Sequence, residues 1–233
     1  MFIPLYDTNR LRHIRLQYVT IGLIAVNALV FLITSIGGEN FRNAAVLGLG
    51  FIPSVVHDKV ELSSEFVVIP ESLSYLTYAF LHADIFHLGG NMLFLWVFGD
   101  NVEDALGHIR YLIFYLLCAA AGAFFQGLVA WDSQVPLIGA SGAIAGVVAA
   151  YLMMRPCARV EVLIFWFPMA LAAYWVLGFW VLTQVWHILQ QAHDGTAWWA
   201  HIGGLLAGGT LILVLRPPGV RLFECVRPLG MFR

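Results

Sequence analysis

Apolar stretches of membrane-spanning length constrain this 233-residue chain more than any other feature. The segment Tyr18–Ile36 is the first of them, and a helix needs about 20 apolar residues to cross the hydrocarbon core of a bilayer. Apolar residues make up 61% of the chain and charged residues 11%, whereas soluble domains carry about 45–50% and about 25%. The mean hydropathy is +0.82. The sequence therefore predicts an all-α polytopic membrane protein with a single bundle of six helices.

Polar or glycine-rich segments separate the six expected spans, whose ranges are 18–36, 76–98, 111–131, 136–154, 160–182 and 198–215. A cytoplasmic segment 1–16 is expected before the membrane domain 17–216, and a cytoplasmic tail 217–233 after it. The outer loop 37–74 mixes glycines, prolines and acids with apolar residues, which is typical of short helices lying at a membrane interface. Residues 183–197 are expected to form a second, polar outer loop.

Basic residues indicate which side of the membrane each loop faces, because Lys and Arg concentrate in cytoplasmic loops. Only Arg42 and Lys59 fall on the side of the 37–74 loop. The other ten of the twelve fall on the side of both termini: Arg10, Arg12, Arg15, Arg110, Arg155, Arg159, Arg216, Arg221, Arg227 and Arg233. We therefore expect both termini in the cytoplasm. Because no transit peptide is recognised, the expected location is a cell membrane, such as the bacterial inner membrane.

A serine flanked by small residues lies in the fourth apolar segment, in the run Gly139-Ala140-Ser141-Gly142. Pro136 can open a helix there, which would place Ser141 in the first turns, where backbone N–H groups are free and the helix dipole is positive. A lone serine of this kind is more often a packing residue, because small side chains let membrane helices approach each other. The alternative is a nucleophile near a helix N-terminus.

His201 is expected at nearly the same depth as Ser141. With a rise of about 1.5 Å per residue, Ser141 lies roughly 7 Å and His201 roughly 5 Å below the outer ends of their helices. Ser and His within hydrogen-bond reach form the smallest nucleophile and base pair. Glycines spaced four apart would let the two helices pack closely, namely Gly142 with Gly146 and Gly204 with Gly208.

Three polar residues of the second span, His82, His87 and Asn91, fall in the same outer half of the membrane. Ionisable groups inside a membrane are costly and by default indicate function. His87 and Asn91 are four residues apart on one helix face, so their N–H groups and the backbone N–H of Ser141 would hold the oxyanion of a tetrahedral intermediate. His82 projects about 140° away if the helix continues, so we expect a structural role for it.

Three motifs taken together resemble the rhomboid intramembrane serine proteases. They are Gly139-Ala140-Ser141-Gly142, His82-x4-His87-x3-Asn91 and Ala200-His201-x2-Gly204-x3-Gly208. The resemblance covers roughly residues 17–216. One departure from the family pattern stands shortly before the first histidine, where Leu73 and Ser74 replace a Trp-Arg pair that many members carry.

The resemblance implies a six-helix bundle with serine endopeptidase activity on transmembrane-anchored proteins, near the outer membrane boundary. It implies Ser141 as the nucleophile and His201 as its base, a dyad without a third catalytic acid. It also implies His87 and Asn91 as oxyanion donors. Membrane lipid and transmembrane substrates would be the partners, and neither a cofactor nor a metal is required.

The resemblance further implies supporting roles for four residues: His82, Gly139, Gly142 and, as an inner structural anchor, Glu103. The fifth span and the 183–197 loop would match the lateral gate and the cap of the family. The aromatic residues of that span are also typical of an interfacial belt and lipid-facing bulk, so both interpretations stay open.

Two other functional classes were weighed against a protease. A catalytically silent relative that binds transmembrane segments usually lacks the serine or the histidine, and this chain has both. A transporter or channel needs a polar path through both leaflets, which the apolar inner halves of the spans oppose. The net charge of -2 gives no sign of a nucleic-acid partner.

The remaining histidines and cysteines are interpreted as structural. His187 and His193 lie in the polar outer loop and are expected to be solvated, and the neighbouring Asp194 would complete a triad only if this loop folded inward. The cysteines are scattered and odd in number, which predicts neither a disulfide framework nor a zinc site and favours inert thiols: Cys118, Cys157 and Cys225.

Overall fold

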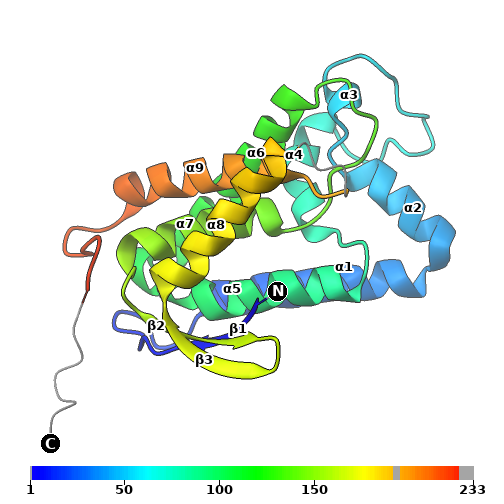
Figure 1. Cartoon of the computed structure of the whole chain (residues 1–233). Coiled ribbons are helices and arrows are strands. Elements are labelled where there is room, and N and C mark those ends of the chain that lie inside the picture. Colours follow the sequence, from blue (N-terminus) through cyan, green and yellow to red (C-terminus); the bar gives the residue numbers. More distant parts are fainter. Residues whose placement is uncertain (1, 191–194, 226–233) are drawn as a thin grey trace, which may run out of the picture.

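Helices make up most of the chain, and one small sheet lies beside them (Figure 1). The computed structural model describes residues 2–190 and 195–225. The longer helices are α1 (Tyr18–Ile36), α5 (Ile85–Leu106), α6 (His108–Val129), α7 (Ser141–Met154), α8 (Ala173–Leu189) and α9 (Trp198–Leu215). Shorter helical segments between α1 and α5 are α2 (Gly38–Leu49), α3 (Pro53–Val56), η1 (Glu71–Leu73), α4 (Ser74–Thr77) and η2 (Tyr78–Phe80). The strands are β1 (Phe2–Asp7), β2 (Arg159–Ile164) and β3 (Phe167–Ala172).

Three helices, α1, α6 and α9, are long and apolar enough to cross a membrane. α1 and α9 begin and end where the sequence predicts the first and sixth spans. α7 and α8 are apolar but shorter, with 14 and 17 residues, and α5 has acidic residues in its last two turns. The mostly helical membrane protein is therefore supported, whereas an arrangement with six spans stays a prediction.

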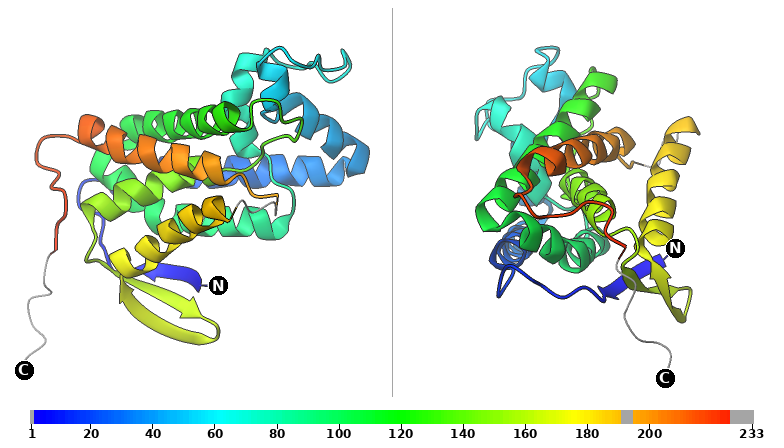
Figure 2. Two further views of the ribbon diagram at one scale, coloured as in Figure 1. Left: turned by 45° about the horizontal axis from the view of Figure 1, so that its top comes forward. Right: turned by 90° about the vertical axis from the view of Figure 1, so that its left-hand side faces the viewer.

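α7 lies among α5, α6 and α9, at the centre of the bundle (Figure 2). Ten of its 14 residues are buried. A Cβ atom on Gly204 would collide with the carbonyl group of Gly142, and one on Gly208 would collide with the backbone of Gly146. The predicted close packing of these two helices is therefore confirmed, because only glycine leaves room for such an approach.

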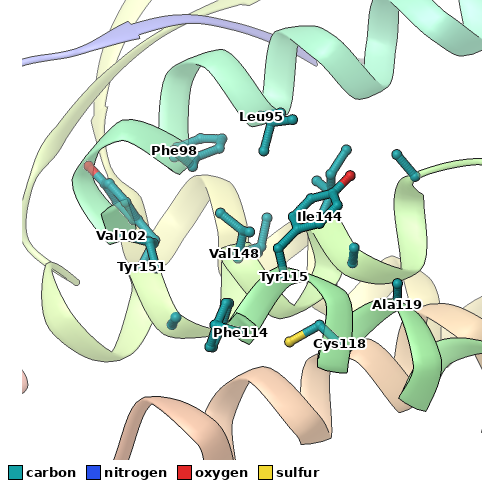
Figure 3. Close-up of a cluster of buried hydrophobic side chains, with 14 of the residues drawn as sticks. Leu95, Phe98, Val102, Phe114, Tyr115, Cys118, Ala119, Ile144, Val148 and Tyr151 are labelled. Carbon is teal, nitrogen blue, oxygen red and sulfur yellow. The ribbon is translucent and has the colours of Figure 1, made fainter. Parts of the chain in front are cut away.

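Large apolar side chains fill the space between α5, α6 and α7 (Figure 3). Leu95 and Phe98 come from α5, Phe114 and Tyr115 from α6, and Val148 from α7, and all five are fully buried. Close packing of this kind leaves little room for a helix to shift. The layer therefore fixes α7 and the residue with which it begins.

The two ends of the bundle are easily distinguished. We call the end at which Ser141 and Trp198 begin their helices the serine end, and the end at which α5 and α7 finish, at Leu106 and Met154, the opposite end. In Figure 1 the serine end lies on the side of α2 and α3, and the opposite end on the side where α9 finishes.

A three-stranded antiparallel sheet, ordered β1-β2-β3, replaces the first half of the predicted fifth span. The prediction of a helix over 160–182 and of an all-α fold is wrong here. Buried Val160 and Val162 alternate with the charged residues Arg159 and Glu161, a period of two that is typical of strands. The turn contains Phe165 in a left-handed conformation, at φ 54°.

This sheet lies between α5 and α8 (Figures 1 and 2). β1 packs against α5, and β2 and β3 pack against α8. Asp7, at the end of β1, accepts hydrogen bonds from the Tyr151 hydroxyl of α7 and from the Asn101 amide of α5, at 2.5 and 3.0 Å. The sheet therefore ties the start of α8 to the opposite end of the bundle.

Two acids near the end of α5 hold the chain that leads into α1. Buried Glu103 accepts hydrogen bonds from the backbone N–H groups of Val19 and Thr20, at 2.9 and 2.8 Å, and from the Thr20 hydroxyl at 2.7 Å. Asp104 accepts hydrogen bonds from the backbone N–H groups of residues 12–14. Glu103 thus has the contacts expected of an inner anchor.

Residues 223–225 are joined to the end of α7 and to the chain that follows it. Cys157 and Cys225 form a disulfide, so the expectation of inert thiols is wrong for this pair and holds only for the buried Cys118. The backbone N–H of Phe223 donates to the carbonyl of Met153 at 2.7 Å. The two bonded cysteines are 68 residues apart, a separation that gives no spacing signal.

Candidate active site

Ser141 is the first residue of α7, and the loop before it is tightly held. Gly139 has φ +115°, a conformation that L side chains rarely adopt, and its N–H donates to the carbonyl of Tyr78 at 3.0 Å. Pro136 does not open the helix as expected. Instead, Leu137 pairs with Phe51 of the outer loop through two backbone hydrogen bonds, of 3.1 and 2.8 Å.

This pairing also bears on the Trp-Arg pair that the chain lacks. Leu73 is partly exposed, and the hydroxyl of Ser74 donates to the carbonyl of Glu71 at 2.5 Å. The outer loop is joined to the segment before Ser141 by its own backbone, through Phe51. The outer loop thus has a backbone anchor that lies outside the two substituted positions.

The structure brings Ser141 and His201 together from α7 and α9. The distance between Ser141 Oγ and His201 Nε2 is 2.8 Å, which is a good hydrogen-bond length. His201 is buried in the first turn of α9, where its backbone N–H donates to the carbonyl of Ala197. The close approach of α7 and α9 at Gly204 makes this distance possible. The pair can transfer a proton from the hydroxyl to the imidazole.

The other ring nitrogen of His201 meets a residue that the sequence did not single out. Nδ1 lies 2.8 Å from Oε1 of Gln184, a buried residue of α8. The sequence places Gln184 in the polar loop 183–197, because the predicted span ends at 182. Because the β2–β3 hairpin occupies the chain up to Ala172, α8 begins at Ala173 and ends at Leu189. Gln184 therefore lies within this helix and is buried in the bundle.

Aromatic rings enclose His201. The ring centroid of Trp180 lies 6.0 Å from that of His201, and Trp198 lies 5.7 Å away, edge to face. His187 stacks on Trp198 with centroids 4.2 Å apart, so it is part of α8 and not a solvated loop residue as expected. His193 and Asp194 lie outside the described residues. The rings of Trp180 and Trp198 exclude bulk water from the imidazole of His201.

His87 and Asn91 lie one turn apart on α5 and face the loop before Ser141. A Cβ atom on Gly139 would come within 2.7 Å of His87 Nε2 and 3.7 Å of Asn91 Nδ2. The Asn91 amide nitrogen is buried and has no hydrogen-bond partner among the described residues. A buried donor without a partner costs free energy, so an unpaired one calls for an explanation. Both side chains therefore face Gly139, two residues before Ser141.

His82 lies in the loop before α5, which begins at Ile85. The helix therefore does not extend back to His82, as its predicted projection angle assumed. Asp84 ends the loop by accepting hydrogen bonds from the backbone N–H groups of Phe86 and His87, at 2.8 and 2.9 Å, and the His87 bond contributes most to lowering the pKa of Asp84. The ring of His82 is buried and lies 5.0 Å from that of His87. The rings of His82 and His87 are thus neighbours, in an edge-to-face arrangement.

Comparison with known proteins places these features in a family. Residues 70–218 match the model of the Rhomboid domain. The chain belongs to the rhomboid family. Members of this family are generally intramembrane serine proteases. The predicted resemblance is therefore confirmed.

Similar proteins occur in organelles of eukaryotes. Rhomboid protein 1, mitochondrial, of Saccharomyces cerevisiae is 30% identical in an alignment 178 positions long, which covers 71% of this chain and 49% of that protein. Presenilin-associated rhomboid-like protein, mitochondrial, of Homo sapiens is 27% identical in an alignment 235 positions long, gaps included, which covers 92% of this chain and 54% of that protein. RHOMBOID-like protein 6, mitochondrial, of Arabidopsis thaliana is 32% identical in an alignment 155 positions long, which covers 63% of this chain and 45% of that protein. The chain spans about half the length of these relatives.

The names of these relatives contradict the expected location in a cell membrane with cytoplasmic termini. They are mitochondrial proteins, and a further relative from Arabidopsis thaliana is named as chloroplastic. The expectation of a bacterial inner membrane rested on the composition of the first residues and is wrong. The comparisons point to an organellar membrane.

Proposed function

We propose that this rhomboid protein is a serine endopeptidase that cleaves membrane-anchored proteins at the serine end of its bundle. The observation that supports this most strongly is the 2.8 Å distance between Ser141 Oγ and His201 Nε2, in a site enclosed by aromatic rings. We propose six spans, α1 and α5 to α9, in a mitochondrial or chloroplast membrane. Lipid surrounds the bundle, and the substrates are proteins with a transmembrane segment.

In the proposed reaction His201 is the general base. Its Nε2 takes the proton of the Ser141 hydroxyl while Oγ attacks the carbonyl carbon of a substrate peptide bond. The imidazolium then gives this proton to the leaving amine, and an ester between Ser141 and the substrate remains. A water molecule, deprotonated by the same nitrogen, hydrolyses the ester. The two protein groups return to their starting states.

The negative charge of the tetrahedral intermediate falls beside Gly139. We assign its stabilisation to the side-chain N–H groups of His87 and Asn91 and to the backbone N–H of Ser141. Donors of this kind act strongly where water is excluded, and the loss of one typically lowers a rate by about 10²–10³-fold. The unpaired amide of Asn91 supports this role, because it acquires an acceptor only when the oxyanion forms.

The substrate has to present an extended segment to Ser141. In a helix, each peptide carbonyl is shielded and hydrogen-bonded within the helix. Sequences that unwind easily are therefore the expected cleavage sites. A catalytically silent rhomboid-like protein that binds transmembrane segments is the alternative, and the distance between Oγ and Nε2 gives no reason to favour it.

A fluorophosphonate probe tests the proposal, because it forms a covalent bond only with an activated serine. Purified protein in detergent would be labelled for the wild type and for Ser141→Ala and His201→Ala. The matched control is Ser64→Ala, which removes an exposed loop serine. We expect labelling of the wild type and of the control and none of the two site variants. Equal labelling of wild type and Ser141→Ala would contradict the assignment.

A further inference from the structure

Gln184 occupies an unusual position on α8. The structure describes the whole of α8. Its buried residues are Ala173, Val176, Leu177 and Gln184. The first three are apolar and lie near the start of α8, whereas Gln184 is polar, 2% exposed and lies at the serine end. Leu182 and Trp186, which lie near it on the helix, are 67% and 60% exposed. Gln184 is thus the one buried residue in this half of α8.

Hydrogen bonds fix the orientation of that amide. Its nitrogen lies 2.7 Å from the backbone carbonyl of Trp180, which can only accept a hydrogen bond, and 3.0 Å from the Thr183 hydroxyl. The Thr183 hydroxyl donates its proton to the same carbonyl, at 2.6 Å, so it accepts from the amide. Exchanging the oxygen and the nitrogen would place Oε1 against this carbonyl. The Gln184 oxygen therefore faces His201.

This orientation determines the tautomer of His201. The oxygen of Gln184 can only accept, so His201 Nδ1 has to carry the proton in the 2.8 Å contact between them. In a neutral imidazole the other nitrogen, Nε2, is then an acceptor. Nε2 is the nitrogen that faces Ser141 Oγ, so this tautomer is the one that can take the proton of the serine.

We infer that Gln184 is the positioning residue of the dyad: its oxygen holds the proton on Nδ1, orients the ring and stabilises the imidazolium that forms during attack. The inference rests on the proposed function. A carboxylate has this role in many serine hydrolases. Here a neutral amide from a helix other than α7 and α9 provides it.

The other groups around His201 do not offer this contact. Ser141 faces it from α7, His87 is close enough on α5 to interact with it electrostatically, and Trp180 and Trp198 contact its ring. Among the described residues, no carboxylate forms a hydrogen bond or an ion pair with His201. Without Gln184, Nδ1 would lose the acceptor that fixes its proton.

The first test is the rate of fluorophosphonate labelling of the full chain in detergent, for Gln184→Met. Methionine keeps the length of the side chain but has no strong acceptor. We expect the second-order labelling rate to fall about 10- to 100-fold, as for loss of a hydrogen bond to a charged group. Gln126→Met is the matched control, since Gln126 is a partly buried glutamine of α6 outside the site. It should label at the wild-type rate.

The pH profile of labelling separates positioning from a merely structural role. Gln184→Glu retains an acceptor for Nδ1 but adds a negative charge, which favours the imidazolium. We expect this variant to keep more activity than Gln184→Met at high pH. We also expect the acid limb of its profile, over which the base loses its proton, to lie about one pH unit or more above that of the wild type.

The outcomes distinguish this inference from the proposed function. A wild-type protein without Ser141-dependent labelling would overturn the proposed function and this inference with it. A labelled wild type with an unchanged rate for Gln184→Met would overturn this inference alone. If Gln184→Met fails to fold, as judged by its melting transition, the pH profile of Gln184→Glu decides, and a profile equal to that of the wild type would overturn the inference.

Discussion

Gly204 on α9 lies directly against the carbonyl oxygen of Gly142 on α7, and no space is left for a Cβ atom between them. This contact brings the two helices close enough for Ser141 and His201 to form a hydrogen bond. The glycines of the two motifs thus act by letting the backbones of α7 and α9 approach closely. The position of the base depends on how closely the two backbones approach.

Gly204→Ala should therefore weaken both the fold and the dyad. The added methyl group forces α9 away from α7, and overpacking of this kind typically costs about 1–3 kcal/mol. We expect a lower melting temperature and slower fluorophosphonate labelling. The control is Gly209→Ala on the same helix, where the nearest atom, Met153 Sδ, is 3.5 Å from the new Cβ. Equal effects of the two variants would show that packing at Gly142 is unimportant.

Asn91→Ala should separate activity from stability. Its amide nitrogen is buried and unpaired among the described residues, so its removal relieves an unfavourable burial and should leave the melting temperature unchanged or higher. The labelling rate should fall about 10²–10³-fold if the amide binds the oxyanion. The comparison is Asn101→Ala, which removes a hydrogen bond to Asp7 far from Ser141. That variant should lose stability and keep its labelling rate.

The disulfide between Cys157 and Cys225 should contribute to stability through the closed loop of 68 residues. Such a crosslink typically stabilises a protein by about 2–4 kcal/mol. Treatment with a thiol reductant should lower the melting temperature of the wild type towards that of Cys225→Ser. The same reductant should leave the variant unaffected. A wild-type melting temperature that does not respond to complete reduction would argue against this contribution.

Asp7 should make stability depend on pH. Burial raises the pKa of its carboxyl above the ordinary value of 3.8, although hydrogen bonds from Tyr151 and Asn9 oppose this. The folded state thus holds this proton more tightly than the unfolded state, and stability falls as pH rises from about 3.8 through the raised pKa. Asp7→Asn should remove that part of the pH dependence. The measurement is the melting temperature of both proteins as a function of pH across this range. Equal pH dependence of the two melting temperatures would contradict the prediction.

The sequence predicts the parts of the fold that depend on local pattern. α1 and α9 have the predicted boundaries because each is a mostly apolar run without Asp, Glu, Lys or Arg, followed by Gly37 or Arg216. The glycine pairs predict the contact of α7 with α9 because their spacing is that of one helix face. The juxtaposition of Ser141 with His201 follows from their similar expected depths below the outer ends of their helices.

The missed features depend on relations between distant or apolar segments. Residues 160–182 are apolar apart from Glu161, and hydropathy alone does not distinguish a hairpin followed by a helix from a single helix. The predicted start of the fifth span is therefore wrong, and Gln184 falls in a predicted loop. The partner of Cys157 lies 68 residues away, where no spacing rule applies. The disulfide and the burial of Gln184 needed the three-dimensional arrangement, whereas the alternation of residues 159–162 is a signal of β2 in the sequence.

The sheet between α5 and α8 determines how these two helices can separate. It joins them where α8 begins, whereas nearer the serine end α8 contacts α5 through Phe94 and Trp180. Gln184 lies eleven residues from Ala173, the first residue of α8, at a distance of about 17 Å. A tilt of about 10° would move Gln184 by about 3 Å, as much as the length of its bond to His201. A small angular displacement of α8 away from α5 would therefore also separate Gln184 from the imidazole of His201.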